Sequence, residues 1–299
     1  MYKYGVHKTA WGHLVDPNAM DLFFDQVKQT GSDLVEMRVP DPCVLGDDVK
    51  IREIRKMAED RGLGMVFGFG YPPGVDMRSD DIYARKFAVQ HLITAIKGVA
   101  KIGGSEIGGV LYSTWPTVYT APITRQMRYE HVQRCIECIR QVMPAAEDLG
   151  IRLNMEVLNR FENYIINTAA EGIEFCKAVG SKNIGLLLDT FHMSIEENDI
   201  AQAIRSAKDY IGKLHCTEPN RGVPFHNKRI NWPEIGQALK DIGFNKPIII
   251  EAVLASDDAA IFTFYMKMWR DIISDISLEG RITALKNGIS FLKKQFNDE

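Results

Sequence analysis

Short apolar segments alternate with longer amphipathic segments along the whole chain, and this alternation constrains the fold more than any other feature. Runs such as residues 184–188 and 247–250 are continuously apolar, as are strands covered on both faces of a sheet. The pattern predicts strands at residues 4–6, 34–37, 64–69, 106–111, 153–158, 184–189, 213–216 and 247–251. It predicts helices near residues 19–30, 48–62, 81–102, 124–149, 169–179, 198–208, 232–242 and 261–296, the last in one or two pieces.

This order of elements predicts an α/β protein, a single (β/α)8 TIM barrel that spans residues 1–299 as one domain. Glycines stand where several predicted helices must end, at Gly31, Gly62, Gly150 and Gly243. No linker or low-complexity tract divides the chain. No Gly-x-Gly-x-x-Gly sequence follows the first strand, which argues against a doubly wound, dinucleotide-binding sheet.

Charge and hydropathy exclude several classes of partner. The formal net charge is −3 and no basic cluster is present, so we expect no nucleic-acid partner. No apolar run reaches transmembrane length, and the N-terminus lacks the pattern of a signal peptide, so we expect a cytoplasmic protein without a membrane partner. The five cysteines fit a reducing compartment. Cys135 and Cys138 have CxxC spacing, but they lie in a helical pattern without a second pair, which favours two half-buried helix residues over a redox or zinc site.

Four metal-binding side chains stand at the ends of the last four predicted strands: Glu156, Asp189, His215 and Glu251. In a barrel of this kind the carboxyl ends of the strands form the active-site face. Glu156 ends a buried apolar run and needs a partner for its charge, for which a divalent cation is suited. A single acidic residue at a strand end is more often a solvated loop residue or a helix cap. Four on successive strands predict a site for Mn²⁺, Co²⁺ or Mg²⁺.

Further polar residues follow these strand ends. Glu162 lies six residues after Glu156, His192 three residues after Asp189, and Arg221 in a loop-type sequence after His215. Their alternative role is that of ordinary loop residues, since a flexible arginine is usually solvent-facing. Three residues beyond the fourth strand would give a sugar an apolar wall or would pack at the rim of the barrel: Tyr112, Trp115 and Pro116.

Several segments resemble the D-allulose (D-psicose)/D-tagatose 3-epimerases, which belong to the xylose-isomerase-like barrel superfamily. Residues 156–168 (EVLNRFENYIINT) and 188–197 (LDTFHMSIEE) carry the longest and most specific similarity. Residues 215–221, in the pattern His-x-x-Glu-x-Asn-Arg, also match, as do 108–116 and 268–271. The similarity extends over nearly the whole chain.

The resemblance implies roles for these residues. It implies one divalent metal ion per subunit, Mn²⁺ or Co²⁺ with Mg²⁺ as a further candidate, bound by Glu156, Asp189, His215 and Glu251. It implies that Glu156 and Glu251 are the acid and base. The residues expected to bind the O1–O2 end of a ketose are Glu162, His192 and Arg221, with Trp115 lining the pocket.

The chemistry of epimerisation is consistent with such a site. A carbon next to a ketone exchanges its proton through an enediolate, which a Lewis-acidic metal stabilises. Two carboxylates on opposite sides of that carbon supply base and acid without rotation of the intermediate, and each serves either role according to the substrate epimer. Direct ligation would hold these carboxylates ionised, and Arg221 would add positive charge near O1 and O2.

The early strands depart from the family pattern. His7 stands where the family commonly has an aromatic residue, Phe69 where it has histidine, and Arg38 where it has a small residue. After Glu251 the chain has Ala-Val at 252–253 in place of Pro-Phe, which predicts more space and the admission of a larger ketose or a keto-glycoside. We expect the residues that read the distal end of the sugar to differ, with His7, Arg38 and Phe69 as candidate substrate contacts.

Arg38 has two interpretations. Its guanidinium suits bidentate recognition of a carboxylate or phosphate. The alternative is a salt bridge to Glu36 or Asp41 at the barrel rim.

We therefore expect a metal-dependent ketose 3-epimerase of the D-fructose/D-allulose or D-tagatose/D-sorbose type that forms a homodimer or homotetramer, with the C-terminal helices as candidates for the contact. The nearest alternative is an aldose–ketose isomerase or a 3-keto-glycoside-processing enzyme with the same metal site. An endonuclease-IV-like enzyme would need three clustered zinc ions and more than the seven histidines present. A non-enzymatic sugar-binding protein would not need two carboxylates on one metal.

Overall fold

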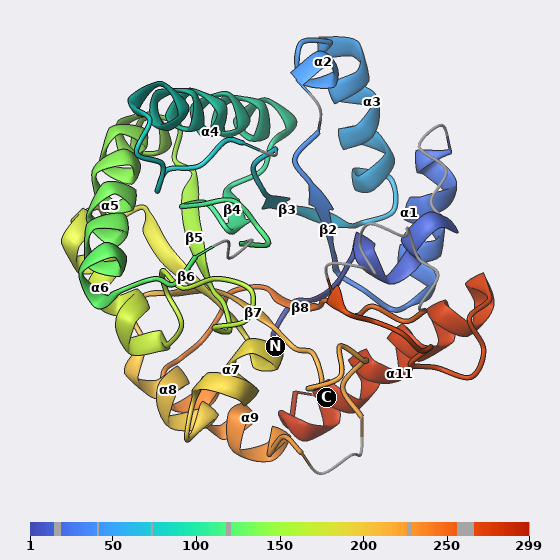
Figure 1. Ribbon diagram of the computed structural model, residues 1–299. Helices are drawn as coiled ribbons and strands as arrows, with labels where there is room; N and C mark the ends of the chain where they lie inside the picture. Colours follow the sequence, from blue (N-terminus) through green and yellow to red (C-terminus); the bar gives the residue numbers. More distant parts are fainter. Residues whose placement is uncertain are drawn as a thin grey trace.

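Eight parallel strands close into a barrel in the order in which they occur along the chain, which confirms the predicted TIM barrel (Figure 1). The computed structural model describes residues 1–14, 19–40, 42–72, 74–117, 121–225, 229–255 and 266–298. The strands are β1 (Tyr4–His7), β2 (Leu34–Arg38), β3 (Gly64–Phe69), β4 (Glu106–Gly109), β5 (Arg152–Val157), β6 (Ile184–Asp189), β7 (Ile211–His215) and β8 (Ile248–Ile250). Strands β1 and β8 pair with each other and close the ring.

Helices surround the barrel (Figure 1). They are η1 (Lys8–Leu14), α1 (Met20–Gln29), α2 (Pro42–Leu45), α3 (Asp48–Glu59), α4 (Ile82–Ile102), α5 (Arg125–Asp148), α6 (Ala169–Val179), α7 (Thr190–Glu196), α8 (Ile200–Ser206), α9 (Trp232–Asp241) and α11 (Leu278–Gln295). Because the helices cover the outer face, strands such as β6 are buried at every residue. Among the described residues, no helix combines the length and the apolar composition needed to cross a membrane.

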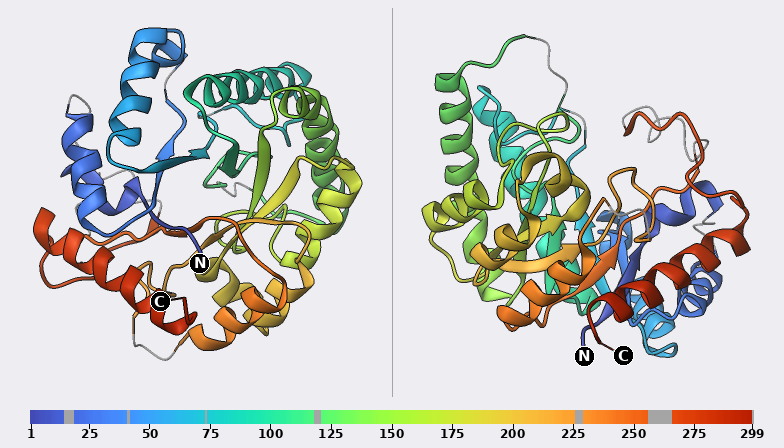
Figure 2. Two further views of the ribbon diagram at one scale, coloured as in Figure 1. Left: turned by 180° about the vertical axis from the view of Figure 1, so that it is seen from behind. Right: turned by 90° about the horizontal axis from the view of Figure 1, so that it is seen from below.

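The chain termini and the loops that follow the strands lie at opposite ends of the barrel. The N- and C-termini lie together at one end, where the backbone N–H of Tyr2 donates to Asp298 Oδ2 over 2.7 Å (Figure 2, right). The carboxyl ends of all eight strands lie at the opposite end because every strand pair is parallel. The loops that follow the strands therefore gather at one mouth.

Several segments differ from the sequence-based expectation, and the short helices η1, α2 and α7 were not predicted. Helix α7 begins directly after β6, where the carboxylate of Asp189 caps it by accepting from the Phe191 N–H over 2.9 Å. The predicted helix over 261–296 is wrong for residues 268–277, and residues 261–265 lie outside the described residues. The Ile272 N–H donates instead to Leu254 O, and Ser277 caps α11.

The CxxC pair lies on α5, as expected. Cys135 and Cys138 are both buried and free. Their thiols face different carbonyl groups, that of Tyr112 for Cys135 and that of Met77 for Cys138. This confirms the interpretation as helix residues, but both are fully buried where half-burial was expected.

Candidate active site

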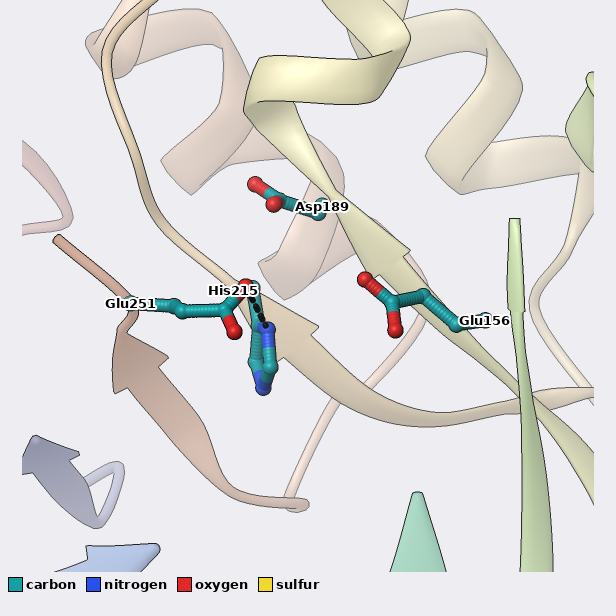
Figure 3. A group of neighbouring side chains, drawn as sticks. All are labelled: Glu156, Asp189, His215 and Glu251. Carbon is teal, nitrogen blue, oxygen red and sulfur yellow. Dashed lines mark hydrogen bonds and ion pairs between the residues drawn. The ribbon is translucent and has the colours of Figure 1, made fainter. Parts of the chain in front are cut away.

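The four predicted ligands converge at the mouth of the barrel. Glu156 lies near the end of β5, Asp189 and His215 are the last residues of β6 and β7, and Glu251 follows β8 directly. Asp189 and His215 are direct partners in the strand register. Each of the four offers a ligand atom within 4.8 Å of the others. In Figure 3, Glu156 and Glu251 reach toward each other from opposite sides, with Asp189 and His215 between them.

The donor set suits a divalent cation. Three carboxylates this close repel one another, and the buried position of Asp189 raises its pKa to about 6. Burial opposes the ionisation of Glu251 as well, but a hydrogen bond with His215 and the nearby charges lower its pKa to about 2. A cation bound between these groups would compensate the negative charge, and three oxygen donors with one imidazole match Mn²⁺, Co²⁺ or Mg²⁺. The residues present therefore fit such an ion.

Arg221 connects this cluster to a second carboxylate. One terminal nitrogen, Nη1, lies 3.3 Å from Asp189 Oδ2, and the other, Nη2, lies 3.1 Å from Glu162 Oε1. The guanidinium carbon lies 3.7 Å from the centroid of the Phe191 ring. Burial raises the pKa of Glu162, but Arg221 and His192 lower it below its usual range. The three predicted residues Glu162, His192 and Arg221 thus lie next to the four-residue cluster.

Loop residues fix these side chains. Trp115 Nε1 donates to Glu162 Oε2 over 2.7 Å, which brings the predicted pocket aromatic to the site. The Asn159 backbone N–H donates to His192 Nδ1 over 3.1 Å, so the other ring nitrogen of His192 faces Glu156 Oε1 at 3.5 Å. Asn159 was not predicted from the sequence, although its place two residues after β5 is a signal for such a role.

The candidates on the early strands are divided between two places. His7 Nδ1 lies 3.8 Å from Glu251 Oε1, at the edge of the cluster. Arg38 and Phe69 line a cavity of about 440 Å³ beside α4, together with His91. Within the described residues, Arg38 makes one long contact, 3.5 Å from Nη2 to the carbonyl oxygen of Gly70. The structure therefore does not bring Arg38 and Phe69 into the four-residue cluster.

The structure also tests the predictions for Tyr112, for the Ala252-Val253 pair and for the partner of Arg38. Tyr112 is fully buried and donates through its hydroxyl to the carbonyl of Glu156 over 2.8 Å, so it packs beneath the site. Ala252 and Val253 are 0% and 1% exposed and therefore present no open surface beside Glu251. The alternative partner of Arg38, Glu36, binds other residues, and Asp41 lies outside the described residues.

A charged network that was not predicted from the sequence lies inside the barrel. Lys213 Nζ lies 2.6 Å from Glu36 Oε1 and 2.7 Å from Glu106 Oε1. Burial raises the pKa of Glu36, but Lys213 and His215 outweigh it and lower the pKa well below the usual range. A signal was present, because Glu36 and Lys213 are charged residues within otherwise apolar strands.

Comparison with known proteins identifies a family to which this chain is similar. A profile of the family described as "Xylose isomerase-like TIM barrel" matches residues 24–272. A D-psicose 3-epimerase from Ruminiclostridium cellulolyticum is 37% identical over 90% of this chain and 89% of its own length. An L-ribulose 3-epimerase from Mesorhizobium japonicum is 30% identical over 92% of this chain and 89% of its own length.

A solved structure agrees with the sequence comparison. The crystal structure of D-psicose 3-epimerase with D-tagatose from Clostridium cellulolyticum H10 superposes with a TM-score of 0.90 at 34% sequence identity. The match covers 98% of this chain and 99% of the other. The similarity therefore includes every strand that contributes to the four-residue cluster.

Proposed function

Because the chain belongs to the D-psicose 3-epimerase family of xylose isomerase-like TIM barrels, we propose that it interconverts free ketoses at C3, with D-fructose/D-allulose or D-tagatose/D-sorbose as the substrate pairs. One observation carries the proposal. Glu156 and Glu251 face each other across a space that Asp189 and His215 also border (Figure 3). Two carboxylates in this arrangement can address opposite faces of one carbon atom.

The reaction requires removal of the C3 proton and its return to the other face. One glutamate, in its ionised form, takes the proton as base, and the other, in its protonated form, delivers its proton as acid to the opposite face; the reverse reaction exchanges the roles of Glu156 and Glu251. One divalent ion per subunit, Mn²⁺ or Co²⁺ with Mg²⁺ as a further candidate, would be held by these two glutamates with Asp189 and His215. Such an ion supplies Lewis-acid stabilisation of negative charge on the carbonyl and hydroxyl oxygens of the ketose.

The neighbouring residues would orient the sugar. Arg221, Glu162 and His192 are proposed to bind O1 and O2, since their side chains already contact one another beside the cluster. Arg221 Nε is buried without a hydrogen-bond partner in the described part of the chain, which supports a ligand oxygen as acceptor. Trp115 would form an apolar wall over the sugar ring or chain.

The distal end of the substrate would extend toward the early strands. His7 at the edge of the cluster is proposed to contact it first, and Arg38 and Phe69 border the cavity of about 440 Å³ farther out. This side of the site carries a guanidinium, an imidazole and a phenyl ring. We expect these groups to determine which ketose is preferred.

Isotope exchange tests the reaction. Metal-loaded protein is incubated in D₂O with D-fructose, D-tagatose, L-ribulose and a 3-keto-glycoside, and the products are separated and examined by NMR. An epimerase introduces deuterium at C3 of the ketose, whereas an aldose–ketose isomerase labels C1 or C2. Absence of C3 label with every ketose in the panel would refute the proposal. Ligand binding that survives chelation without exchange would instead indicate a sugar-binding protein.

We also propose a cytoplasmic homodimer or homotetramer. The four cysteines whose side chains are described are free, which supports a reducing compartment. The buried face of α11, which includes Leu285 and Ile289, already packs within the chain, so any subunit contact by this helix would use its outer face. Light scattering coupled to size-exclusion chromatography measures the subunit number directly, and a monomer would contradict this part of the proposal.

A further inference from the structure

The interior of the barrel below the metal-ligand cluster carries charged side chains, where such barrels usually carry layers of Val, Ile and Leu. Lys213 on β7 contacts Glu36 on β2 and Glu106 on β4. Neither β2 nor β4 is a neighbour of β7 in the sheet, so these contacts pass through the barrel interior. All three side chains are buried, with Lys213 0%, Glu36 1% and Glu106 6% exposed.

The backbone makes room for this network. Gly108 on β4 has no side chain, and a Cβ atom there would lie 3.0 Å from Lys213 Nζ and 2.8 Å from Leu187 Cδ1. An apolar cluster of Leu34, Val66 and Ile249 lies beside this network, with Val66 as the register partner of Glu36 and Ile249 as that of His215. Charged and apolar side chains therefore share the barrel interior.

Glu36 connects this charged network to the metal-ligand cluster. Its Oε1 accepts from Lys213 over 2.6 Å, and its Oε2 lies 2.7 Å from Nε2 of His215. A carboxylate only accepts hydrogen bonds, so the proton of a neutral His215 ring belongs on Nε2. The other ring nitrogen, Nδ1, lies 3.2 Å from Glu251 Oε2 on the side of the cluster, and its lone pair would be available to a cation bound there.

We propose that Glu36 is a positioning residue for the metal site: it fixes the tautomer and the ring orientation of His215, and Lys213 in turn fixes Glu36. Outer carboxylates of this kind orient histidine ligands and raise their basicity, and their loss typically weakens metal binding about 10- to 100-fold. The inference rests on the proposed metal site but not on the identity of the sugar.

Two glutamates on the same lysine provide a matched pair of variants. Glu36→Gln removes the carboxylate that contacts both Lys213 and His215, and Glu106 remains as counter-ion of the lysine. Glu106→Gln removes the carboxylate that contacts Lys213 and Asn154, and Glu36 remains. Each variant deletes one buried charge next to the same ammonium group, so the two are expected to have comparable effects on thermal unfolding of the metal-free protein.

The experiment measures Co²⁺ binding to the metal-free full-length protein by calorimetry and records the visible absorption of the bound ion. Glu36→Gln is expected to raise the dissociation constant about 10- to 100-fold and to shift the Co²⁺ absorption bands. Glu106→Gln is expected to change the constant about threefold or less and to leave the bands in place. Unchanged affinity and bands in Glu36→Gln, or equal losses in both variants, would overturn the inference.

These readouts separate the inference from the proposed function. Co²⁺ binding and its spectrum do not require a ketose. If wild-type protein binds Co²⁺ but exchanges no C3 proton, the epimerase proposal fails while the role of Glu36 is still decided. If C3 exchange occurs and Glu36→Gln binds Co²⁺ as wild type does, only the positioning role fails.

Discussion

Arg221 has a backbone φ of 64°, in the left-handed region that a non-glycine residue occupies only when its surroundings hold it there. The two terminal nitrogens of its guanidinium group contact Glu162 and Asp189, and the guanidinium carbon lies over the Phe191 ring. We predict that Arg221→Lys lowers kcat/KM for the best ketose about 100-fold, because an ammonium group cannot form the fork and the stacked contact together. The affinity for Co²⁺ should change about threefold or less, since the charge is kept.

A matched control is Arg160→Lys, on the loop after β5, with a side chain that is 64% exposed and paired with Glu196. Its kcat/KM should stay within about twofold of wild type, because a surface ion pair contributes little. Steady-state kinetics on both variants check the prediction. Equal activities for Arg221→Lys and wild type would remove Arg221 from the proposed substrate contacts.

The sequence was most informative about residues that end a strand and least informative about residues inside one. Glu156, Asp189, His215 and Glu251 could be identified because each ends or follows an apolar run, and parallel strands bring such ends together. The partnership of Glu36 with Lys213 could not, because the two lie 177 residues apart and meet only through the closed barrel. The position of Arg38 could not be predicted either, because it depends on the packing of α4 against β3.

Helix α6 is held at its first turn by side chains from two directions. Thr168 Oγ1 accepts from the Glu171 N–H over 3.2 Å, and Glu171 Oε2 accepts from the Asn167 N–H over 2.8 Å. We predict that Thr168→Ala destabilises the protein by about 1 kcal/mol, because the cap hydrogen bond is lost. For a chain of this size that corresponds to a fall in Tm of about 2 °C.

Thr283→Ala is the control for this cap. Thr283 lies in the interior of α11 and is exposed, where alanine is the better helix former, so Tm should be unchanged or slightly higher. Scanning calorimetry on both variants measures the difference. A Thr168→Ala protein as stable as wild type would show that Glu171 alone is sufficient to cap the helix.

The thiols packed under the helices should resist alkylation. Burial raises the pKa of Cys138 on α5 to about 11 and that of Cys176 on α6 to about 12. At pH 8 roughly a thousandth or less of each thiol is then ionised, so we predict slow reaction of the native protein with iodoacetamide and an increase of about tenfold per pH unit toward pH 11. Above the unfolded thiol pKa of ~8.5 stability should fall, because the unfolded chain then releases protons that the folded chain retains.

The side chain of Cys43 is not among those described, so the experiment uses a Cys43→Ser variant, in which only the buried thiols remain. Mass spectrometry counts the modified cysteines with time. The same variant in guanidinium should react at every thiol at pH 8. Complete modification of the folded variant within minutes at that pH would contradict the burial of these residues.

The apolar pattern predicted the strands more closely than the short helices η1, α2 and α7. Strands such as β3 and β6 appear at the predicted residues, because a continuous apolar run of this length has few other structures available between two helices. Helix α7 was not predicted, because it begins directly after β6 without a separating turn. Residues 268–277 were predicted to be helical from the pattern of apolar and polar residues, yet a hydrogen bond from Ile272 to the chain after β8 holds them in another conformation.

At the scale of the whole molecule, the site unites distant parts of the sequence. Glu156 and Glu251 belong to β5 and to the chain after β8, and only a closed barrel brings their carboxylates within 4.8 Å. The unfolded chain has no comparable site. A cation bound by these residues would therefore stabilise the folded barrel alone, and its binding would be thermodynamically linked to the stability of the barrel.

We predict that removal of the metal with EDTA lowers Tm and that Co²⁺ restores it. At a free Co²⁺ concentration 100 times Kd, the linkage amounts to about 2.7 kcal/mol. With a shift of about 2 °C per kcal/mol for a chain of this length, Tm should rise by roughly 5 °C over that of the metal-free protein. Relief of the repulsion between three neighbouring carboxylates gives this shift its physical basis.

Two variants identify the origin of that shift. Glu251→Gln replaces one ligand carboxylate by an amide, so its Co²⁺-dependent rise in Tm should be much smaller than that of wild type at the same metal concentration. Glu53→Gln on the exposed side of α3 removes the same charge far from the mouth and should retain the full rise. If Co²⁺ raises Tm equally in all three proteins, the ion binds elsewhere, and the four residues at the strand ends are not its ligands.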